Sequence, residues 1–241
     1  MNKLINNDCL KELCDGGGIP DKSIDLVLCD PPYGTTKNKW DTVLDLDKMW
    51  KGLKRVIKPG AAIIMFGSEP FFSTLVMSNL KWFRYDLIWL KPKGTDFLNS
   101  KRKPLRAHEN IAVFCEKGTL YNPQMREGTP YKVTPSHTPS SNYGKYNPEQ
   151  AVINETGLRY PLTYQLFKRE TGLHPTQKPV PLLEWLIKTY SNEGDTVLDF
   201  CMGSGSTGVA CKNTNRDFVG IELNKEYFQI AKERIESINL L

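Results

Sequence analysis

The sequence predicts an α/β domain built on a mostly parallel β-sheet. Short apolar runs that are typical of buried strands alternate with segments of helical periodicity over most of the chain. Two of these runs lead into sharp turns, one rich in proline at residues 30–33 and one rich in glycine at residues 203–208. The 241 residues are enough for one large domain, or for a domain that carries an insertion.

The strands and helices follow in chain order from these runs and from the residues that end them. Apolar runs predict strands at residues 3–7, 24–29, 61–66, 82–90, 110–115, 196–200 and 218–222. Helical periodicity predicts helices at 45–57, 70–79 and 179–190, one that begins at 206, and an amphipathic one at 225–238. Pro59 and Gly60 are expected to end the first helix, and Pro179 suits the first turn of the third.

Two stretches, residues 91–110 and 118–173, lose this periodicity. Basic residues are frequent in both, and the second adds tyrosines between Pro, Ser and Asn. A solvated, partly disordered loop is one interpretation, but disordered segments are usually poor in aromatic residues. Because phosphates attract cations and bases stack on flat rings, we interpret these stretches as an inserted region that contacts nucleic acid.

The composition is that of an ordinary globular protein, with 39% hydrophobic and 24% charged residues and a net charge of +5. The mildly basic balance permits a nucleic-acid partner without requiring one. No apolar run is long enough to cross a membrane and the first residues carry no signal-peptide pattern, so we expect a cytoplasmic protein. The six cysteines form no CxxC pair and the three histidines have no ligand spacing, so reduced thiols and no metal site are expected.

The most informative motif is Asp30-Pro31-Pro32-Tyr33, which follows the apolar run 24–29. Neither proline has an N–H, and both have a fixed φ, so the carbonyls at this turn are held in place as acceptors. A carboxylate, fixed carbonyls and an aromatic face suit a planar ring that bears an amino group. The ring would stack on Tyr33, and its amino hydrogens would bond to Asp30 and a proline carbonyl.

A second candidate site is the glycine turn that follows the strand predicted at 196–200. Gly203, Gly205 and Gly208 have the G-x-G-x-x-G spacing, which alone is a weak signal. Glu222 strengthens it, because an acid about 20 residues further on, at the end of the next strand, suits ribose hydroxyls. The turn would suit NAD or another adenosine ligand, and a tight strand–helix turn with an incidental acid is the alternative.

The two motifs together favour a methyl donor over NAD. A dehydrogenase does not need the rigid corner at Asp30, whereas methyl transfer to an amino group needs that corner and an S-adenosylmethionine site. No metal and no covalent nucleophile is required for this reaction.

At this point the chain resembles the amino-group DNA methyltransferases. Residues 30–33 match the family's catalytic D-P-P-Y motif, residues 199–205 resemble its cofactor motif, and residues 174–179 resemble the H-P-T-Q-K-P segment before it. The catalytic motif precedes the cofactor motif, with a variable region between them, which resembles the β group of the family. Only the variable region is unmatched.

The resemblance implies a Rossmann-like S-adenosylmethionine-dependent methyltransferase fold that is circularly permuted and carries an inserted target-recognition region. Residues 1–91 would form the catalytic half and residues 174–241 the cofactor-binding half. Residues 92–173 would form the variable target-recognition region, including a sheet strand near 110–115. The first strand would then lie next to the strand that ends at Glu222.

The resemblance also implies the site residues. The catalytic residues would be Asp30, Pro31, Pro32 and Tyr33. The residues that bind S-adenosylmethionine would be Asp8, Cys9, Asp30, Thr176, Lys178, Asp199, Phe200, Gly203, Gly205, Ser206, Thr207, Glu222, Leu223 and Asn224. For contacts with DNA we predict Lys37 and Lys39, on a lid at residues 34–40, and Lys101, Arg102, Lys103 and Arg106.

Several of these residues have a structural alternative. Asp8 and Asn224 would each suit the N-cap of the helix that follows. Lys178 would otherwise be a solvated lysine before a helix, Asp199 would only order the glycine turn, and Phe200 would be plain core. The resemblance favours Asp8 near the cofactor adenine, Phe200 against its sulfonium, and Lys178 with Thr176 near its methionine part. His174 is more typical of a structural residue.

The predicted activity is site-specific methyl transfer from S-adenosylmethionine to adenine N6 in DNA, by direct attack after base flipping. Transfer to cytosine N4 is the alternative, since in the family Asp-Pro-Pro is more typical of adenine and Ser-Pro-Pro of cytosine. A non-catalytic nucleotide- or DNA-binding protein on the same fold is an alternative of another class. No Pro-Cys dipeptide occurs, which argues against attack on cytosine C5. Double-stranded DNA is the expected partner, and a homodimer and a cognate restriction endonuclease stay open.

Overall fold

The central β-sheet is mixed, and its parallel strands come from the N-terminal and C-terminal portions of the chain. The computed structural model describes residues 3–14, 16–34, 42–133, 152–170, 172 and 177–238. Within these residues the sheet has eight strands in the order β1-β10-β9-β2-β3-β5-β4-β8. Their bounds are β1 Lys3–Ile5, β10 Asp217–Ile221, β9 Thr196–Asp199, β2 Ile24–Cys29, β3 Ile57–Gly67, β5 Arg106–Phe114, β4 Phe83–Thr95 and β8 Tyr164–Leu166. The first five strands in this order are parallel, and β5 is antiparallel to both of its neighbours.

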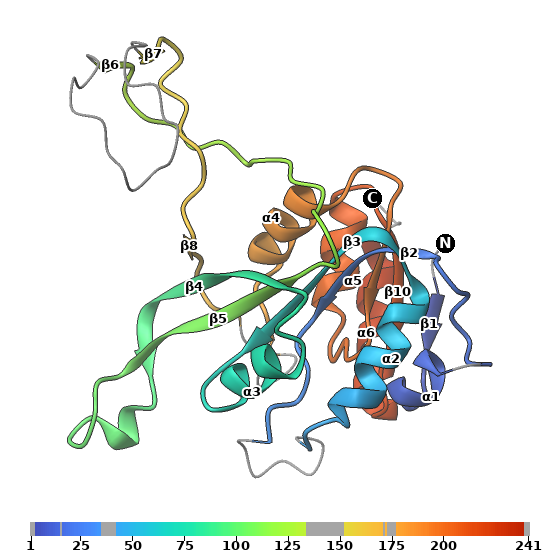
Figure 1. Ribbon diagram of the computed structural model, residues 1–241. Helices are drawn as coiled ribbons and strands as arrows, with labels where there is room; N and C mark the ends of the chain where they lie inside the picture. The colour runs from blue at the N-terminus through green and yellow to red at the C-terminus, as the bar shows by residue number, and fades with distance from the viewer. Residues whose placement is uncertain are drawn as a thin grey trace. The chain divides into compact units, whose positions relative to one another are not determined.

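Helices cover both faces of this sheet (Figure 1). Contacts join α1 Cys9–Leu13 to α2 Leu46–Val56 and α2 to α3 Phe71–Ser78, and these helices share one apolar core with the sheet. On the other face α4 Val180–Tyr190 contacts α5 Ser206–Asn213, and α5 contacts α6 Lys225–Ser237. The first strand of the chain, β1, pairs with the last, β10, and so forms the edge of the sheet on that side.

The two cores follow from the alternation of side chains along the strands. On β2, Val27 and Cys29 face the core of α1, α2 and α3, whereas Leu26 and Leu28 face the core of α4, α5 and α6. Since both faces are covered, consecutive residues are buried, which is why β2 is a continuous apolar run in the sequence.

The helix and strand predictions are confirmed within a few residues, and the permuted strand order is confirmed by the pairing of β1 with β10. The helix predicted at 45–57 ends at Val56, but Pro59 and Gly60 do not end it, because they already belong to β3. The prediction that residues 91–110 are irregular is wrong in part: β4 continues to Thr95, and β5 begins at Arg106. The strand β8, in the second irregular stretch, was not predicted.

The long β4–β5 hairpin extends past the sheet to a short 3₁₀ turn, η1, at Phe97–Asn99 (Figure 1). Its outer end is exposed, and two of its apolar side chains face solvent, with Phe97 74% and Leu98 83% accessible. The side chain of Lys103 forms an ion pair with Asp96 at 2.5 Å, which ties the two sides of the tip together.

Residues 123–162 form a compact unit of their own, apart from the unit of residues 1–122 and 163–241. In its described part, β6 Tyr131–Val133 pairs antiparallel with β7 Val152–Asn154, and a bridge joins Arg126 to Arg159. The guanidinium of Arg159 lies over the Tyr131 ring, 4.2 Å from its centroid. This unit is narrower than the range 92–173 that we predicted for target recognition. In the described part of the chain, no helix is both long and apolar enough to span a bilayer.

Candidate active site

The proline corner and the glycine turn lie side by side at one edge of the sheet. Strands β2 and β9 are parallel neighbours, with Leu26 opposite Val197 and Val27 opposite Leu198. Asp30 directly follows β2, and the glycine turn directly follows β9. Since the carboxyl ends of parallel strands meet at one edge, two motifs far apart in the sequence become neighbours.

Both motifs border one cavity of about 610 Å³, a volume within the range of small-molecule sites. The lining includes most of the residues predicted to bind the cofactor: Asp8, Cys9, Asp30, Lys178, Asp199, Phe200, Gly203, Ser206, Thr207, Glu222, Leu223 and Asn224. The corner residues Pro31, Pro32 and Tyr33 line it too. Thr176 and His174, and the lid lysines Lys37 and Lys39, lie outside the described residues.

Gly205 is predicted to bind the cofactor but does not line the cavity. It precedes α5 with a φ of +79°, in the left-handed region that favours glycine. A β-carbon there would lie 2.9 Å from the Ala231 β-carbon and 3.0 Å from its α-carbon. Gly205 therefore allows the turn to pack directly against α6.

Two acids hold the glycine turn in shape. Asp199 accepts hydrogen bonds from the Thr207 hydroxyl at 2.6 Å and from the Cys201 N–H at 3.1 Å. Glu222 accepts from the Gly203 N–H at 2.9 Å and from the Asn224 N–H at 2.8 Å. Burial raises the pKa of Asp199 to about 6, and burial also raises the pKa of Glu222.

Asp8 and Asn224 are both helix caps as well as cavity residues. The Asp8 carboxylate accepts from the Leu10 N–H at 2.8 Å, at the start of α1. The Asn224 side-chain oxygen accepts from the N–H groups of Glu226 at 2.8 Å and Tyr227 at 3.1 Å, at the start of α6. The capping alternative is thus confirmed for both residues, and their place on the cavity wall leaves room for a second role.

Three thiols, those of Cys9, Cys29 and Cys201, lie on the cavity wall. The hydrogen bond with Cys201, together with burial, raises the pKa of the Cys9 thiol. Burial raises the pKa of Cys29, and the hydrogen bond with Cys29 raises that of Cys201. Thiols in this state are protonated and are poor nucleophiles.

At the corner, Tyr33 donates a hydrogen bond from its hydroxyl to Oδ1 of Asp30. The Tyr33 ring stacks on Phe71 of α3, with the centroids 5.1 Å apart and an interplanar angle of 19°. One face of the tyrosine is therefore fixed against the protein. Burial raises the pKa of Asp30, although the ammonium of Lys178 acts in the opposite direction.

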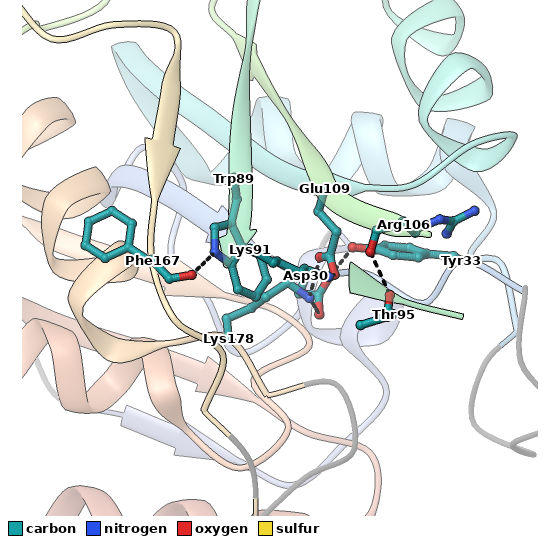
Figure 2. A network of polar contacts seen from close by, with 9 residues as sticks. All are labelled: Asp30, Tyr33, Trp89, Lys91, Thr95, Arg106, Glu109, Phe167 and Lys178. Carbon is teal, nitrogen blue, oxygen red and sulfur yellow. Dashed lines mark hydrogen bonds and ion pairs between the residues drawn. The ribbon is translucent and has the colours of Figure 1, made fainter. Parts of the chain in front are cut away.

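An ion network that the motifs do not include surrounds Asp30 (Figure 2). Lys178, just before α4, donates to Oδ2 of Asp30, and its Nζ lies 3.4 Å from Oε2 of Glu109 on β5. Lys91 on β4 donates to Oε1 of Glu109. Two ammonium groups thus balance two carboxylates, in side chains that are between 6% and 21% exposed.

The charges of this network set the protonation of its members. Burial would raise the pKa of Glu109, but Lys178 and Lys91 outweigh burial and lower it. Burial opposes the charged form of Lys178, but Asp30 and Glu109 outweigh burial and raise the pKa of its ammonium. Lys178 and Glu109 are therefore both ionised near neutral pH.

Sequence reasoning missed Glu109 and Lys91, and also the segment Thr42–Asp45 that lines the cavity before α2. Neither Glu109 nor Lys91 belongs to a motif, and each lies in a stretch that we took as irregular. The one available signal was position: Lys91 directly follows the strand predicted at 82–90, and Glu109 directly precedes the one predicted at 110–115. A charge that a strand end buries needs a partner.

The sheet order and the two adjoining motifs are those of a Rossmann-like methyltransferase fold. The family model described as DNA methylase matches residues 24–233. The type II methyltransferase M.HpaI of Haemophilus parainfluenzae is 29% identical over 249 residues, which cover 98% of this chain and 74% of that protein. M2.DpnII of Streptococcus pneumoniae is 29% identical over 265 residues, which cover 98% of this chain and 90% of that protein.

Among solved structures, M1.HpyAVI in a complex with SAM superimposes with a TM-score of 0.67 at 26% identity, over 98% of this chain and 99% of that one. The chain therefore belongs to the N6-adenine/N4-cytosine family of DNA methyltransferases.

Proposed function

We propose that the protein methylates the N6 atom of adenine at specific sites in DNA. Its cofactor is S-adenosylmethionine. The observation that carries the proposal is the position of Asp30, at the corner of the same cavity that the glycine turn borders. Asp-Pro-Pro at this corner supports adenine over cytosine N4, since the family resemblance associates Ser-Pro-Pro with cytosine.

The cavity fits S-adenosylmethionine in size and in the kinds of side chain on its wall. The acids Asp8 and Glu222 suit the adenosine part, and Glu222 would bind its ribose hydroxyls. Phe200, which is 1% exposed, offers a ring to the sulfonium. The bound cofactor supplies an electrophilic methyl group, and the residues of this chain orient the amino group that receives it.

The corner would act on a base that has left the duplex, because the reacting amino group inside a base stack is not accessible. The base would stack on the face of Tyr33 turned away from Phe71, while Asp30 and the Pro31 carbonyl accept its two N6 hydrogens. These bonds would turn the nitrogen lone pair away from the ring and toward the methyl group. Rate enhancement would come from orientation and electrostatics.

The β4–β5 hairpin is the surface that we propose for contact with the DNA backbone. Its tip carries Lys101, Arg102, Lys103 and Arg106, all exposed. The stem of the hairpin contains Lys91 and Glu109, which are linked to Asp30 through Lys178 (Figure 2). The hairpin continues from this stem to its tip (Figure 1). Arginines and lysines placed in this way neutralise phosphates without reading sequence.

The unit of residues 123–162 is the region that we propose for base recognition, whereas Lys37 and Lys39 would contact phosphates. Its described part exposes Tyr131 and Tyr160 among arginines and a lysine. The named relatives are type II methyltransferases, which supports a role in restriction–modification. A cognate endonuclease and a homodimer are further proposals.

The variant Asp30→Ala tests the catalytic assignment. We expect it to lose methyl transfer to unmethylated bacteriophage DNA with tritiated S-adenosylmethionine, because the acceptor for the amino group is gone. Binding of S-adenosylmethionine, measured by calorimetry, should be largely kept, because the other cofactor residues on the cavity wall remain. NAD is titrated as the control nucleotide. Methylation at the wild-type rate would overturn the role of Asp30, and a wild-type protein that does not bind S-adenosylmethionine would overturn the function as a whole.

A further inference from the structure

Both carboxylate oxygens of Asp30 already accept hydrogen bonds in this structure. Tyr33 donates to Oδ1, and the Lys178 ammonium donates to Oδ2 (Figure 2). The proposed function requires Asp30 to accept a hydrogen from the target amino group. A cation bound to the carboxylate competes for the same oxygen and offsets the negative charge that would polarise the amino group.

Lys178 cannot leave Asp30 for solvent at low cost. Its side chain is only 7% exposed, and its Nζ lies 5.0 Å from the Phe66 ring centroid and 5.9 Å from that of Tyr33. A buried ammonium without a carboxylate partner is strongly unfavourable. The ammonium therefore needs a second carboxylate within reach when the target base arrives.

Glu109 provides such an acceptor. Its Oε2 is buried and accepts no hydrogen bond within the described part of the chain, and it lies 3.4 Å from Nζ of Lys178. A shift of roughly 0.6 Å would bring the two atoms to the usual distance of a charge-assisted hydrogen bond. Lys91 holds the other oxygen of Glu109, so the carboxylate is fixed in place to receive the ammonium.

We propose that Glu109 is a positioning residue that takes the Lys178 ammonium from Asp30 when the target amino group binds. In the free enzyme the Lys178 ammonium donates a hydrogen bond to Asp30 and forms a longer ion pair with Glu109. In the enzyme with a base in the corner, Lys178 bonds to Glu109, and Oδ2 of Asp30 is available to the amino group. The inference rests on the proposed function, since it assigns Asp30 the role of acceptor.

The variant Glu109→Gln tests this role, because the amide keeps the size of the side chain and removes its charge. Lys178 should then stay on Asp30, and the single-turnover rate of methyl transfer at saturating S-adenosylmethionine should fall about 10- to 100-fold, the usual weight of a hydrogen bond to a charged group. The dissociation constant for S-adenosylmethionine should not change. Glu109→Asp keeps the carboxylate and should recover part of the rate.

Glu109→Gln also leaves Lys91 without its carboxylate, so a second variant separates the two effects. Glu109→Gln with Lys91→Met removes the unpaired ammonium, and we expect this double variant to be as slow as Glu109→Gln alone. If the double variant recovers the wild-type rate, the loss came from Lys91 and the inference is wrong. If thermal melting shows that Glu109→Gln does not fold, the test uses the double variant instead. Its rate of methyl transfer is then compared with that of Lys91→Met alone.

The outcomes also separate this inference from the proposed function. A wild-type protein that methylates DNA, with a Glu109→Gln variant that does so at the same rate, overturns the role of Glu109 and leaves the methyltransferase function standing. A wild-type protein that transfers no methyl group overturns both. A slow variant that has lost affinity for S-adenosylmethionine would show Glu109 to be a cofactor residue, which also contradicts the inference.

Discussion

The substitution Gly205→Ala measures how tightly the glycine turn is packed against α6. Gly205 has a φ of +79°, where an L-residue with a β-carbon costs about 1–2 kcal/mol. The new β-carbon would also approach Ala231 Cα to 3.0 Å and Ile235 Cδ1 to 3.1 Å. Ala231 Cα belongs to the backbone of α6 and cannot turn aside, so overpacking should add about 1–3 kcal/mol.

Gly194 offers a matched control in the loop between α4 and β9. Its φ is +83°, almost the same as that of Gly205, but a β-carbon there would meet nothing within 4 Å. Gly194→Ala should therefore show the cost of the left-handed backbone alone. The difference between the two variants in free energy of unfolding should be about 1–3 kcal/mol, all of it due to packing.

Urea denaturation followed by circular dichroism gives the two free energies of unfolding, and calorimetry gives the affinity for S-adenosylmethionine. In Gly205→Ala the turn must shift, and Gly203 and Ser206, which line the cavity, should shift with it. We expect a loss of cofactor affinity of at least about tenfold, the equivalent of 1.4 kcal/mol, and no loss in Gly194→Ala. Equal destabilisation of both variants, or an unchanged affinity in Gly205→Ala, would refute the reasoning.

Two other predictions concern the pH dependence of stability and the binding of DNA. Burial raises the pKa of Asp199 to about 6, so its contribution to stability is present at low pH and is lost as the pH rises through that value. In urea titrations from pH 5 to pH 8, the free energy of unfolding of the wild type should fall by about 1 kcal/mol relative to that of Asp199→Asn. A difference that stays constant over this range would contradict the raised pKa. The double variant Lys101→Ala/Arg102→Ala should bind DNA more weakly, and the slope of the logarithm of the DNA-binding constant against the logarithm of the salt concentration should become shallower by up to about 2. The control Lys188→Ala/Lys232→Ala removes the same charge from α4 and α6 and should leave that slope unchanged.

The parallel part of the fold was predictable because its signals are local. A strand buried on both faces is a continuous apolar run, as in β2, and the motifs at strand ends identify which edge of the sheet carries the site. Helix bounds were accurate where a cap residue such as Asp45 or Asn224 precedes the helix. The neighbours β1 and β10 followed from the family resemblance.

The hairpin and the ion network were not predictable in the same way. The outer ends of β4 and β5 pair with each other beyond the core, so they need no apolar alternation, and their sequence is like that of a loop. Glu109 reaches Asp30 only through Lys178, which is 69 residues further along the chain (178 − 109), and no spacing rule connects them. The structural role of Gly205 likewise depends on Ala231 in another helix.

The central claim is that the corner at Asp30 presents an adenine amino group to the methyl donor. The most direct test is mass spectrometry of nucleosides from unmethylated bacteriophage DNA that has been incubated with the wild-type protein and S-adenosylmethionine, with Asp30→Ala as the blank. The account predicts N6-methyldeoxyadenosine in the wild-type sample and none in the blank. N4-methyldeoxycytidine in its place, or no methylated nucleoside at all, would contradict it.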